Sequence, residues 1–264
     1  MAPVPFHNGA MTDSHSASPA TPKAPKQAPS PRQTTAPRRT PRTAAAPAAS
    51  QPTAQRAPSA SRLRKERVIL TEAENHFAQF GFEGASLENI AAAAGLSRHN
   101  LLYYFPSKEA LYRRVLDDVL TQWLEGMEDL SQGQDDPAQA LRRYIRAKLH
   151  SSRERPNGAK VFTKEVIAGA PRYADAITRR VTPVLKAEVR AFEKWAREGR
   201  IARVNFTHLM FIIWSVTQAY ADQQAQFALL LGKPALDASD FERAEELISH
   251  LVLSGLRATA PAKG

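Results

Sequence analysis

From Ser61 onward the sequence repeats one pattern, in which apolar residues recur at helical spacing between single glycines, prolines and serines. The first such stripe holds Ile69, Ala73, Phe77 and Phe80, which share one face of a helix. We find no convincing alternation of apolar and polar residues of the kind that marks half-buried strands, and no internal repeat. The chain is therefore expected to be all-α, with about nine helices after Ser61.

Short residues between the stripes indicate where helices begin and end. Ser86 and Ser97 suit N-caps, whereas Gly81 and Gly95 suit helix C-termini. Pro183 falls inside a segment with helical periodicity and is expected either to kink that helix or to begin a new one. The segment 156–158 is expected to be a turn. Longer helices are expected over about 108–130, 137–155, 159–168, 172–198, 207–231 and 239–256.

Residues 1–60 differ in composition from the rest of the chain. They hold seven of the Lys and Arg residues, one acidic residue and 12 of the 19 prolines. Such a segment has too few apolar side chains to offset the entropy cost of ordering, so we expect residues 1–60 to form a disordered basic tail. We expect a second, short disordered tail at 259–264. The long tail carries most of the net charge of +10. Its role stays open between a solvated extension and a basic arm that attracts DNA phosphates.

Composition excludes several classes of site. The absence of cysteine excludes disulfides, thiol nucleophiles and cysteine-ligated metals. The seven histidines show no metal-ligand spacing, and the glycines occur singly rather than in a phosphate-binding loop. No apolar run approaches the roughly 18 residues that span a membrane. We therefore expect a soluble, cytoplasmic protein that is not an enzyme and has no cofactor, metal or membrane association.

Residues 86–104 carry the pattern that points most directly to a function. They place a short helix, a turn at Gly95 and a second helix that begins at Ser97, which is the layout of a helix-turn-helix. Residues 91–94 are all alanine, and small side chains allow two short helices to pack closely. A helical hairpin of this kind also occurs in ordinary three-helix cores, so that alternative stays open at this point.

The second of these helices would carry the DNA contacts. Arg98, His99 and Asn100 project from its first turn, the part of such a helix that reaches base edges in the major groove. Hydroxyl and ammonium groups around it can donate to phosphates. The candidate DNA-contacting residues are Ser86, Ser97, Arg98, His99, Asn100, Tyr103, Tyr104 and Lys108.

The sequence around this motif resembles that of a known protein family. The stretch 76–112, HFAQFGFEGASLENIAAAAGLSRHNLLYYFPSKEALY, closely resembles the N-terminal domain of tetracycline-repressor-type (TetR family) transcriptional regulators. The matching segments are 80–82, 90–91, 94–97, 103–105 and 107–111. The resemblance covers nearly all of 62–257. It implies a helix-turn-helix DNA-binding domain at 61–107 and an effector-binding and dimerisation domain at 108–258.

Three segments of the second half narrow the resemblance. The segments 144–162 (YIRAKLHSSRERPNGAKVF), 168–171 (AGAP) and 211–222 (FIIWSVTQAYAD) are similar to the pyrimidine-utilisation repressors of this family. That similarity implies a repressor that responds to uracil or thymine. The subgroup commonly has Lys-Thr where Arg98 and His99 stand here, so the operator sequence stays open. Residues 163–165 also differ from the subgroup, whose sequence is more hydrophobic at these positions.

A ligand site is suggested by two residues one helical turn apart. Trp214 and Gln218 lie on one helix face, where an indole can stack on a flat ring and an amide can pair with an imide edge. The resemblance implies a ligand role for Trp123, Trp214 and Gln218. Further candidates are Phe162, Glu165 and Tyr220. The alternative interpretation is that these aromatic side chains are core or dimer packing, as helical aromatic stripes usually are.

The expected partners are double-stranded operator DNA, a small-molecule effector and a second copy of the chain. A stripe formed by Phe241, Ala244, Leu247, Ile248 and Leu251 supports pairing of the last two helices with those of a second copy, although packing within one chain explains the same stripe. Two other functions remain open. One is a family member that senses a different small molecule, and the other is a helical adaptor that has lost DNA binding.

Overall fold

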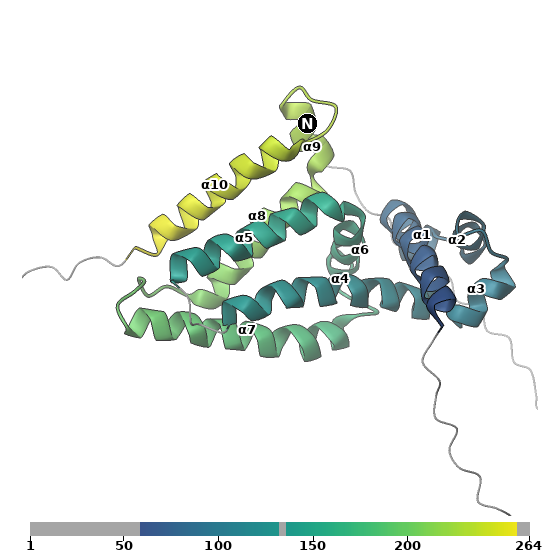
Figure 1. Ribbon diagram of the computed structural model, residues 1–264, viewed down its shortest axis with the longest axis horizontal. Helices are drawn as coiled ribbons and strands as arrows, with labels where there is room; N and C mark the ends of the chain where they lie inside the picture. The colour runs from purple at the N-terminus through teal and green to yellow at the C-terminus, as the bar shows by residue number, and fades with distance from the viewer. Residues whose placement is uncertain (1–58, 132–135, 258–264) are drawn as a thin grey trace, which may run out of the picture. The chain divides into compact units, whose positions relative to one another are not determined.

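The computed structural model describes residues 59–131 and 136–257. This part of the chain is built of ten α-helices without a strand (Figure 1), which confirms the predicted all-α fold. None of its helices has the length and apolar character needed to cross a membrane. The predicted tails lie outside the described residues, except that Ser59 and Ala60 already belong to the start of the first helix. The helices are α1 (Ala60–Gly84), α2 (Leu87–Ala93), α3 (Arg98–Tyr104), α4 (Lys108–Ser131), α5 (Pro137–Glu154), α6 (Pro156–Ile167), α7 (Ala174–Arg197), α8 (Phe206–Asp222), α9 (Gln224–Leu230) and α10 (Ala238–Gly255).

Side-chain caps set the starts of several helices. Ser86 Oγ accepts a hydrogen bond from the Asn89 N–H at 3.1 Å, and Ser97 Oγ accepts one from the Asn100 N–H at 3.2 Å. Both predicted N-caps are therefore confirmed. In α10 the Asp237 carboxylate forms a reciprocal capping box with the first turn. Each such cap stabilises a helix by about 0.5–2 kcal/mol relative to alanine.

The segment between α8 and α9 differs from the prediction. One helix over 207–231 is predicted because this segment contains neither glycine nor proline, but the structure has two helices here and so ten rather than nine. Between them, Gln223 has φ −109° and ψ 18°, outside the helical range. The Tyr220 ring contacts the rings of Phe227 at 5.3 Å and of Phe241 at 5.9 Å. Packing against α10 thus outweighs local helix propensity.

Two prolines behave differently from expectation. Pro183 lies inside the continuous helix α7, so the interpretation that it begins a new helix is wrong. It removes a hydrogen bond to the carbonyl of Arg179, and because both residues are exposed, water can solvate that carbonyl. Pro156 opens α6 instead of forming a turn. The first helical position needs no N–H donor, so proline is accommodated there.

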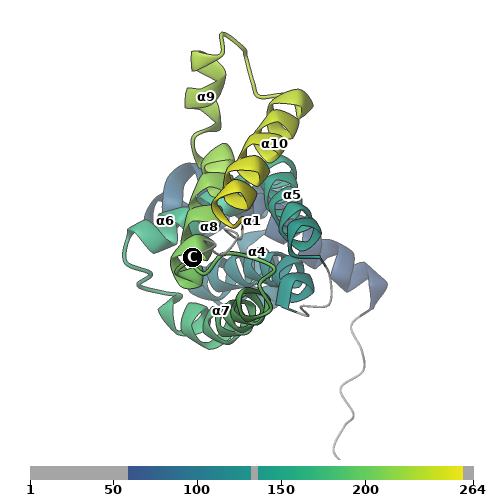
Figure 2. The ribbon, with the colours of Figure 1, turned by 90° about the vertical axis from the view of Figure 1, so that its left-hand side faces the viewer.

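Helix α4 supports both parts of the molecule. It packs against α1 near its beginning and against α5, α6 and α7 along its length. Figure 1 shows it running from the neighbourhood of α1–α3 to the remaining helices, and Figure 2 shows it between α5 and α7. We call α1–α3 the head and α4–α10 the body.

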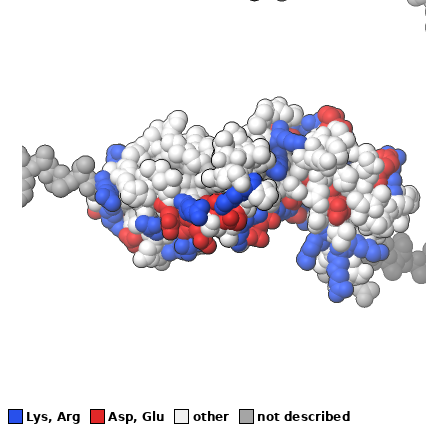
Figure 3. Space-filling model, turned by 90° about the horizontal axis from the view of Figure 1, so that it is seen from above, with Lys and Arg blue, Asp and Glu red and all other residues white. Residues whose placement is uncertain are grey.

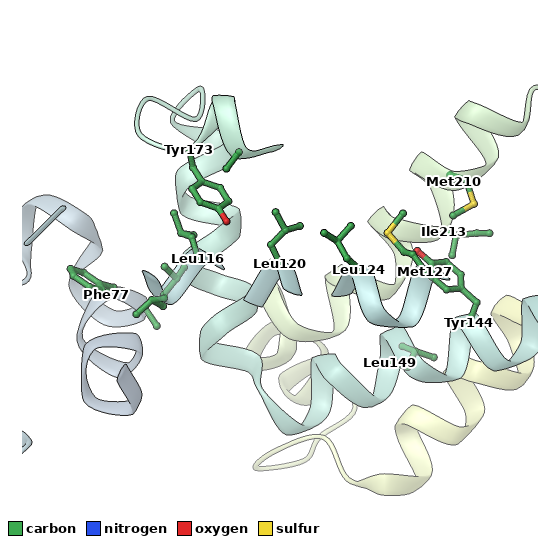
Figure 4. Packing of buried hydrophobic residues seen from close by; sticks show 14 of the residues in the cluster. Phe77, Leu116, Leu120, Leu124, Met127, Tyr144, Leu149, Tyr173, Met210 and Ile213 are labelled. Atoms are coloured by element: carbon green, nitrogen blue, oxygen red, sulfur yellow. The ribbon is translucent and has the colours of Figure 1, made fainter. Parts of the chain in front are cut away.

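One continuous set of buried apolar side chains runs through head and body. Phe77 of α1 belongs to its head end, Leu116 and Leu120 of α4 continue it, and Tyr144 and Ile213 lie within the body (Figure 4). Burial of apolar surface contributes about 25 cal/mol per Å². This shared core therefore contributes to holding the head on the body.

Candidate DNA interface and ligand cavity

The head holds two short helices joined by a tight turn. Gly95 in this turn has φ +68°, a conformation that glycine adopts without steric cost. The Leu96 N–H donates to the Ala91 carbonyl at 2.8 Å and closes the turn. Ile90 of α2 and Leu101 of α3 are fully buried. These contacts fix α3 against α2 and leave its opposite face in solvent, which is helix-turn-helix geometry.

The solvent face of α3 carries the predicted base-reading residues. Arg98, His99 and Asn100 are exposed in its first turn, and Tyr103 follows one turn later with 70% of its surface exposed. Arg98 Nε lies 2.9 Å from Glu88 Oε1, and both side chains are more than half exposed. An exposed ion pair of this kind is weak, so the guanidinium can exchange its partner for a base or a phosphate.

Sequence reasoning missed a basic side chain beside this face. Arg62 Nη1 lies 3.3 Å from the Tyr103 hydroxyl, and Arg62 Cζ lies 5.2 and 5.6 Å from the ring centroids of Tyr103 and Tyr104. Lys and Arg side chains gather over the region of the head in Figure 3. The first two turns of α1 contribute the exposed cations Arg62, Arg64, Lys65 and Arg67. This run of cations was the signal available in the sequence.

Three other predicted DNA contacts hold the head together. Lys108 Nζ donates to the carbonyls of Glu83 and Ala85 at 3.2 and 3.0 Å, so its ammonium links the start of α4 to the end of α1. The hydroxyls of Ser86 and Ser97 accept hydrogen bonds as N-caps. Contact of these three side chains with phosphates stays a prediction.

The body contains a cavity of about 490 Å³. It is open to solvent on one side and is lined by residues of five helices, α4 to α8; four of the six predicted ligand residues line it: Trp123, Phe162, Trp214 and Gln218. Its other walls are mostly apolar. They come from Leu120, Met127, Val166, Ile167, Ile177, Val181 and Ala219, with polar groups from Lys148, Thr163, Ser215, Asp222 and Gln223.

The two indoles of the cavity are fixed by hydrogen bonds at their edges. Trp214 Nε1 donates to the Tyr144 hydroxyl at 2.6 Å, and Trp123 Nε1 donates to Ser151 Oγ at 3.3 Å. The Phe162 ring lies edge-on to Trp123 with 4.8 Å between centroids. The two indoles are therefore held in place where they line the cavity, and aromatic rings of this kind can stack on a flat ligand.

A polar cluster occupies one wall. Gln218 Nε2 lies within hydrogen-bond distance of Thr163 Oγ1 at 3.2 Å and of Asp222 Oδ1 at 3.3 Å, and the Thr163 hydroxyl donates to Asp222 Oδ2 at 2.8 Å. Burial raises the pKa of Asp222 above its ordinary value. A few fixed polar groups in an apolar, aromatic cavity are typical of a small-molecule site.

Comparisons with known proteins now decide the family. The family model described as bacterial regulatory proteins, tetR family, matches residues 69–115, and the model described as YcdC-like protein, C-terminal region, matches 116–259. The HTH-type transcriptional regulator RutR of Escherichia coli K12 is 38% identical over 197 residues, which cover 73% of this chain and 91% of that protein. The chain belongs to the TetR family of bacterial transcriptional regulators.

Solved structures of TetR-family proteins share the fold. A TetR-like transcriptional regulator from Rhodococcus sp. RHA1 has a TM-score of 0.57 at 19% identity, over 76% of this chain and 98% of that one. The TetR family regulator PfmR from Thermus thermophilus has a TM-score of 0.55 at 20% identity, over 71% and 97%. The matched families and relatives are transcriptional regulators rather than enzymes. TetR regulators bind operator DNA and small effectors, typically as dimers.

Two predicted ligand residues of this TetR-family chain lie outside the cavity. Glu165 is buried on another side of α6, where its Oε1 accepts a hydrogen bond from the Arg172 N–H at 2.6 Å. The pKa of Tyr112 is raised first by burial and then by the charge of Glu165. Helical spacing explains the position of Glu165, because the four residues of α6 that line the cavity, Phe162, Thr163, Val166 and Ile167, occupy one arc of the helix and Glu165 lies outside that arc. Tyr220 packs against aromatic rings of α9 and α10, as described above.

Two buried charges were not among the predicted residues. Lys148 of α5 lines the cavity with its Nζ 4.1 Å from the centroid of the Trp123 ring, and Glu188 of α7 is fully buried. Burial lowers the pKa of Lys148 to about 8 and raises the pKa of Glu188 to about 8. Each residue interrupts an apolar stripe, Lys148 between Ile145 and Leu149 and Glu188 ahead of Phe192. A charge inside an apolar stripe was the signal in the sequence.

A second hollow, of about 600 Å³, lies where α1 and α4 meet the α5–α6 junction. Its charged side chains already pair with one another. Arg155 Nε donates to Glu74 Oε2 at 2.7 Å, and Asn157 Nδ2 donates to Asn75 Oδ1 at 3.0 Å. This hollow is therefore a polar contact between head and body rather than a ligand site.

Proposed function

We propose that this TetR-family chain is a homodimeric repressor that acts in the cytoplasm at the nucleoid and releases its operator when a flat pyrimidine, such as uracil or thymine, fills the body cavity. The observation that carries the proposal is that Trp123, Trp214 and Gln218 line one cavity. Stacking on indole and pairing with an amide suit a ring with an imide edge. The 38% identity to RutR supports a regulator of the same kind.

The dimer part of the proposal rests on exposed apolar side chains of α8 and α10. Ile212 and Val216 are one turn apart on α8, and Leu247 and Leu251 are one turn apart on α10, all in contact with solvent in the single chain. Pairing with the same helices of a second copy would bury them as a four-helix interface. Two heads would then be available for two half-sites of a palindromic operator.

The test measures binding of the full chain to DNA from its own upstream region, with and without uracil or thymine. We expect specific, salt-dependent binding that uracil weakens. Truncation of Arg98 to alanine should cost about 1–3 kcal/mol of discrimination between specific and random DNA. Unchanged specific and non-specific affinities in that variant would contradict the placement of α3 in the groove.

The effector half of the proposal is tested with Gln218→Leu. This substitution nearly preserves side-chain volume and removes both hydrogen-bonding groups, so ligand atoms lose their partners at about 1–3 kcal/mol each. Uracil affinity by isothermal titration should fall about tenfold or more. Operator binding should persist, so the variant represses without being relieved. Gln122→Leu, on the exposed face of α4, is the matched control.

Two outcomes favour the other functions. If the chain binds its operator and neither pyrimidine binds the chain, it senses a different small molecule. If it shows no specific binding to its upstream DNA, the interpretation as a helical adaptor gains and the repressor proposal fails.

A further inference from the structure

We propose that Lys148 donates a hydrogen bond to an oxygen atom of the bound effector and so restricts the cavity to flat ring compounds that carry a carbonyl or carboxylate oxygen. The inference rests on the proposed use of the cavity as the effector site. It deepens that proposal by naming the residue and the ligand group that decide which rings are accepted.

The position of Lys148 is the first support. Its side chain is 8% exposed and lines the same cavity as Trp214 and Gln218. Its Nζ lies 4.1 Å from the centroid of the Trp123 ring, in the range of a cation–π contact. The ammonium group therefore lies over one face of the Trp123 indole within the lining of the cavity, where a flat ligand beside that indole would meet it.

The second support is the set of donors that the ammonium has available. Lysine carries three N–H donors, and within the described residues no hydrogen bond from Lys148 Nζ to a protein group is found. This Nζ is not among the fully buried atoms without a partner, so solvent in the cavity can accept hydrogen bonds from it. A ligand that displaces this solvent has to supply an acceptor in its place, and an oxygen of the effector would do so.

Glu188 does not remove this requirement. Its carboxylate acts on Lys148 through charge, yet both of its oxygens are buried and have no hydrogen-bond partner among the described residues. Because burial disfavours the charged form of both groups, the pKa of each lies near 8. A protonated Lys148 has no hydrogen-bonded counter-charge among the described residues, which favours an electron-rich oxygen beside it.

The opposite wall adds a direction. Gln218, Thr163 and Asp222 form the polar cluster described above, and Asp222 contributes acceptor oxygens. A ring with an oxygen towards Lys148 and an N–H towards Asp222 satisfies both walls. Uracil carries both groups, benzoate carries the oxygen alone, and indole carries the N–H alone.

The experiment titrates the full chain by calorimetry with uracil, benzoate and indole. The wild-type protein is expected to bind uracil or benzoate, or both, more tightly than indole. In Lys148→Met, which keeps the side-chain length and removes the donors, affinity for the oxygen-bearing compounds should fall about tenfold or more, while affinity for indole stays the same or rises. Lys186→Met, on the exposed side of α7, is the matched control and should change neither.

Lys148→Arg is a second variant that keeps a donor. It should retain more affinity for uracil or benzoate than Lys148→Met does, which a purely structural role of the lysine does not predict. Thermal unfolding of each variant checks that it folds. If Lys148→Met is unfolded, the ratio of benzoate to indole affinity in the wild type and in Lys148→Arg decides the question.

The outcomes of this experiment distinguish a failure of the role of Lys148 from a failure of the proposed function on which it rests. Binding of benzoate without uracil would end the pyrimidine proposal and leave the role of Lys148 standing. Equal uracil affinity in the wild type and in Lys148→Met would overturn the role of Lys148 and leave the pyrimidine effector standing. Binding of indole alone, or of none of the three compounds, would overturn both.

Discussion

The head presents its candidate functional side chains to solvent, whereas the body arranges its candidate functional side chains around a cavity. In the head, Arg98, His99 and Asn100 stand in solvent on helices whose buried faces are apolar, with Glu74 as the exception. In the body, the cavity is lined by side chains that are mostly buried or half-buried, with exposed residues such as Val166 and Ile167 at its opening. The other buried polar and charged residues in the described part of the chain all belong to the body: Lys148, Ser151, Ser152, Glu165, Glu188, Thr217, Asp240 and Ser249.

This difference has an energetic consequence. A surface that meets DNA requires no buried polar groups, so the head can be packed for stability alone. A ligand site inside the body requires polar groups there, each of which costs free energy unless it is hydrogen-bonded. Lys148 is the one buried charged residue that lines the cavity among the described residues, so it is where the body is expected to lose stability for the sake of the site.

The largest expected effect tests the tight packing of the head. Phe77 is fully buried and meets the Tyr112 ring edge-on at 4.9 Å. Phe77→Ala should lower the free energy of unfolding by about 3–5 kcal/mol, from lost burial and the cavity left behind. Val166→Ala in the wall of the body cavity, where the side chain is 46% exposed, should cost less than about 1 kcal/mol. Urea denaturation of both variants measures this, and equal losses would contradict the contrast.

The second effect concerns the cost of the buried charges. Burial raises the pKa of Glu188 from an ordinary 4.5 to about 8. Between these values the folded protein holds a proton that the unfolded chain has lost, so the free energy of unfolding falls as pH rises, by up to about 1.4 kcal/mol per pH unit. Glu188→Gln cannot lose this proton and should gain stability relative to the wild type across the same window.

Urea denaturation at pH 5 and at pH 7.5 checks this sign. Glu193→Gln, on the exposed face of the same helix, is the control for the substitution itself. Lys148 contributes in the opposite sense at higher pH. Its pKa is lowered from 10.5 to about 8, so the unfolded chain binds the extra proton between these values and stability rises with pH there. A Glu188→Gln variant that loses stability relative to the wild type from pH 5 to pH 7.5 would contradict this account.

A third effect compares two glycines, one in each region. Gly95 in the turn of the head has φ +68°, so Gly95→Ala should cost about 1–2 kcal/mol through the left-handed backbone alone. Gly126 lies inside α4, where an added Cβ would meet Ala147 Cβ at an ordinary 3.9 Å. Gly126→Ala should therefore gain about 0.5–1 kcal/mol from helix propensity. The two shifts in melting temperature should have opposite signs, and a gain for Gly95→Ala would show that the turn tolerates other conformations.

The head was predictable because its determinants are local. The caps at Ser86 and Ser97 act within three residues of the chain, and the turn at Gly95 depends on one backbone conformation. The exposure of His99 then follows, because a residue two positions from the buried Leu101 lies on the opposite side of the helix. Arg62 was missed because its contact with the tyrosines joins residues 41 positions apart.

The body was predictable as helices but not as a site. Its cavity exists because five helices converge, and a periodic pattern specifies each helix face without specifying which faces meet. Trp123 and Trp214 meet Phe162 there, whereas Glu165 falls on a different side of the same helix as Phe162. Lys148 stands on the buried face of α5, but a lysine in a sequence gives no measure of its burial.

The smallest expected effect tests how the two regions are joined. Helix α6 turns Thr163 towards the cavity, and its neighbour Lys164 reaches the head, where Nζ donates to the carbonyl of Ala78 at 2.6 Å and to that of Gln79 at 3.2 Å. Because the Lys164 side chain is exposed, Lys164→Met should change the free energy of unfolding by less than about 1 kcal/mol. It should nevertheless weaken the effect of uracil on operator affinity by about 1 kcal/mol, or fivefold. Operator binding with and without uracil measures that coupling, with Lys194→Met on the exposed face of α7 as control. A coupling that Lys164→Met leaves unchanged would show that the shared apolar core along α4, rather than the polar contact from α6, carries the signal between body and head.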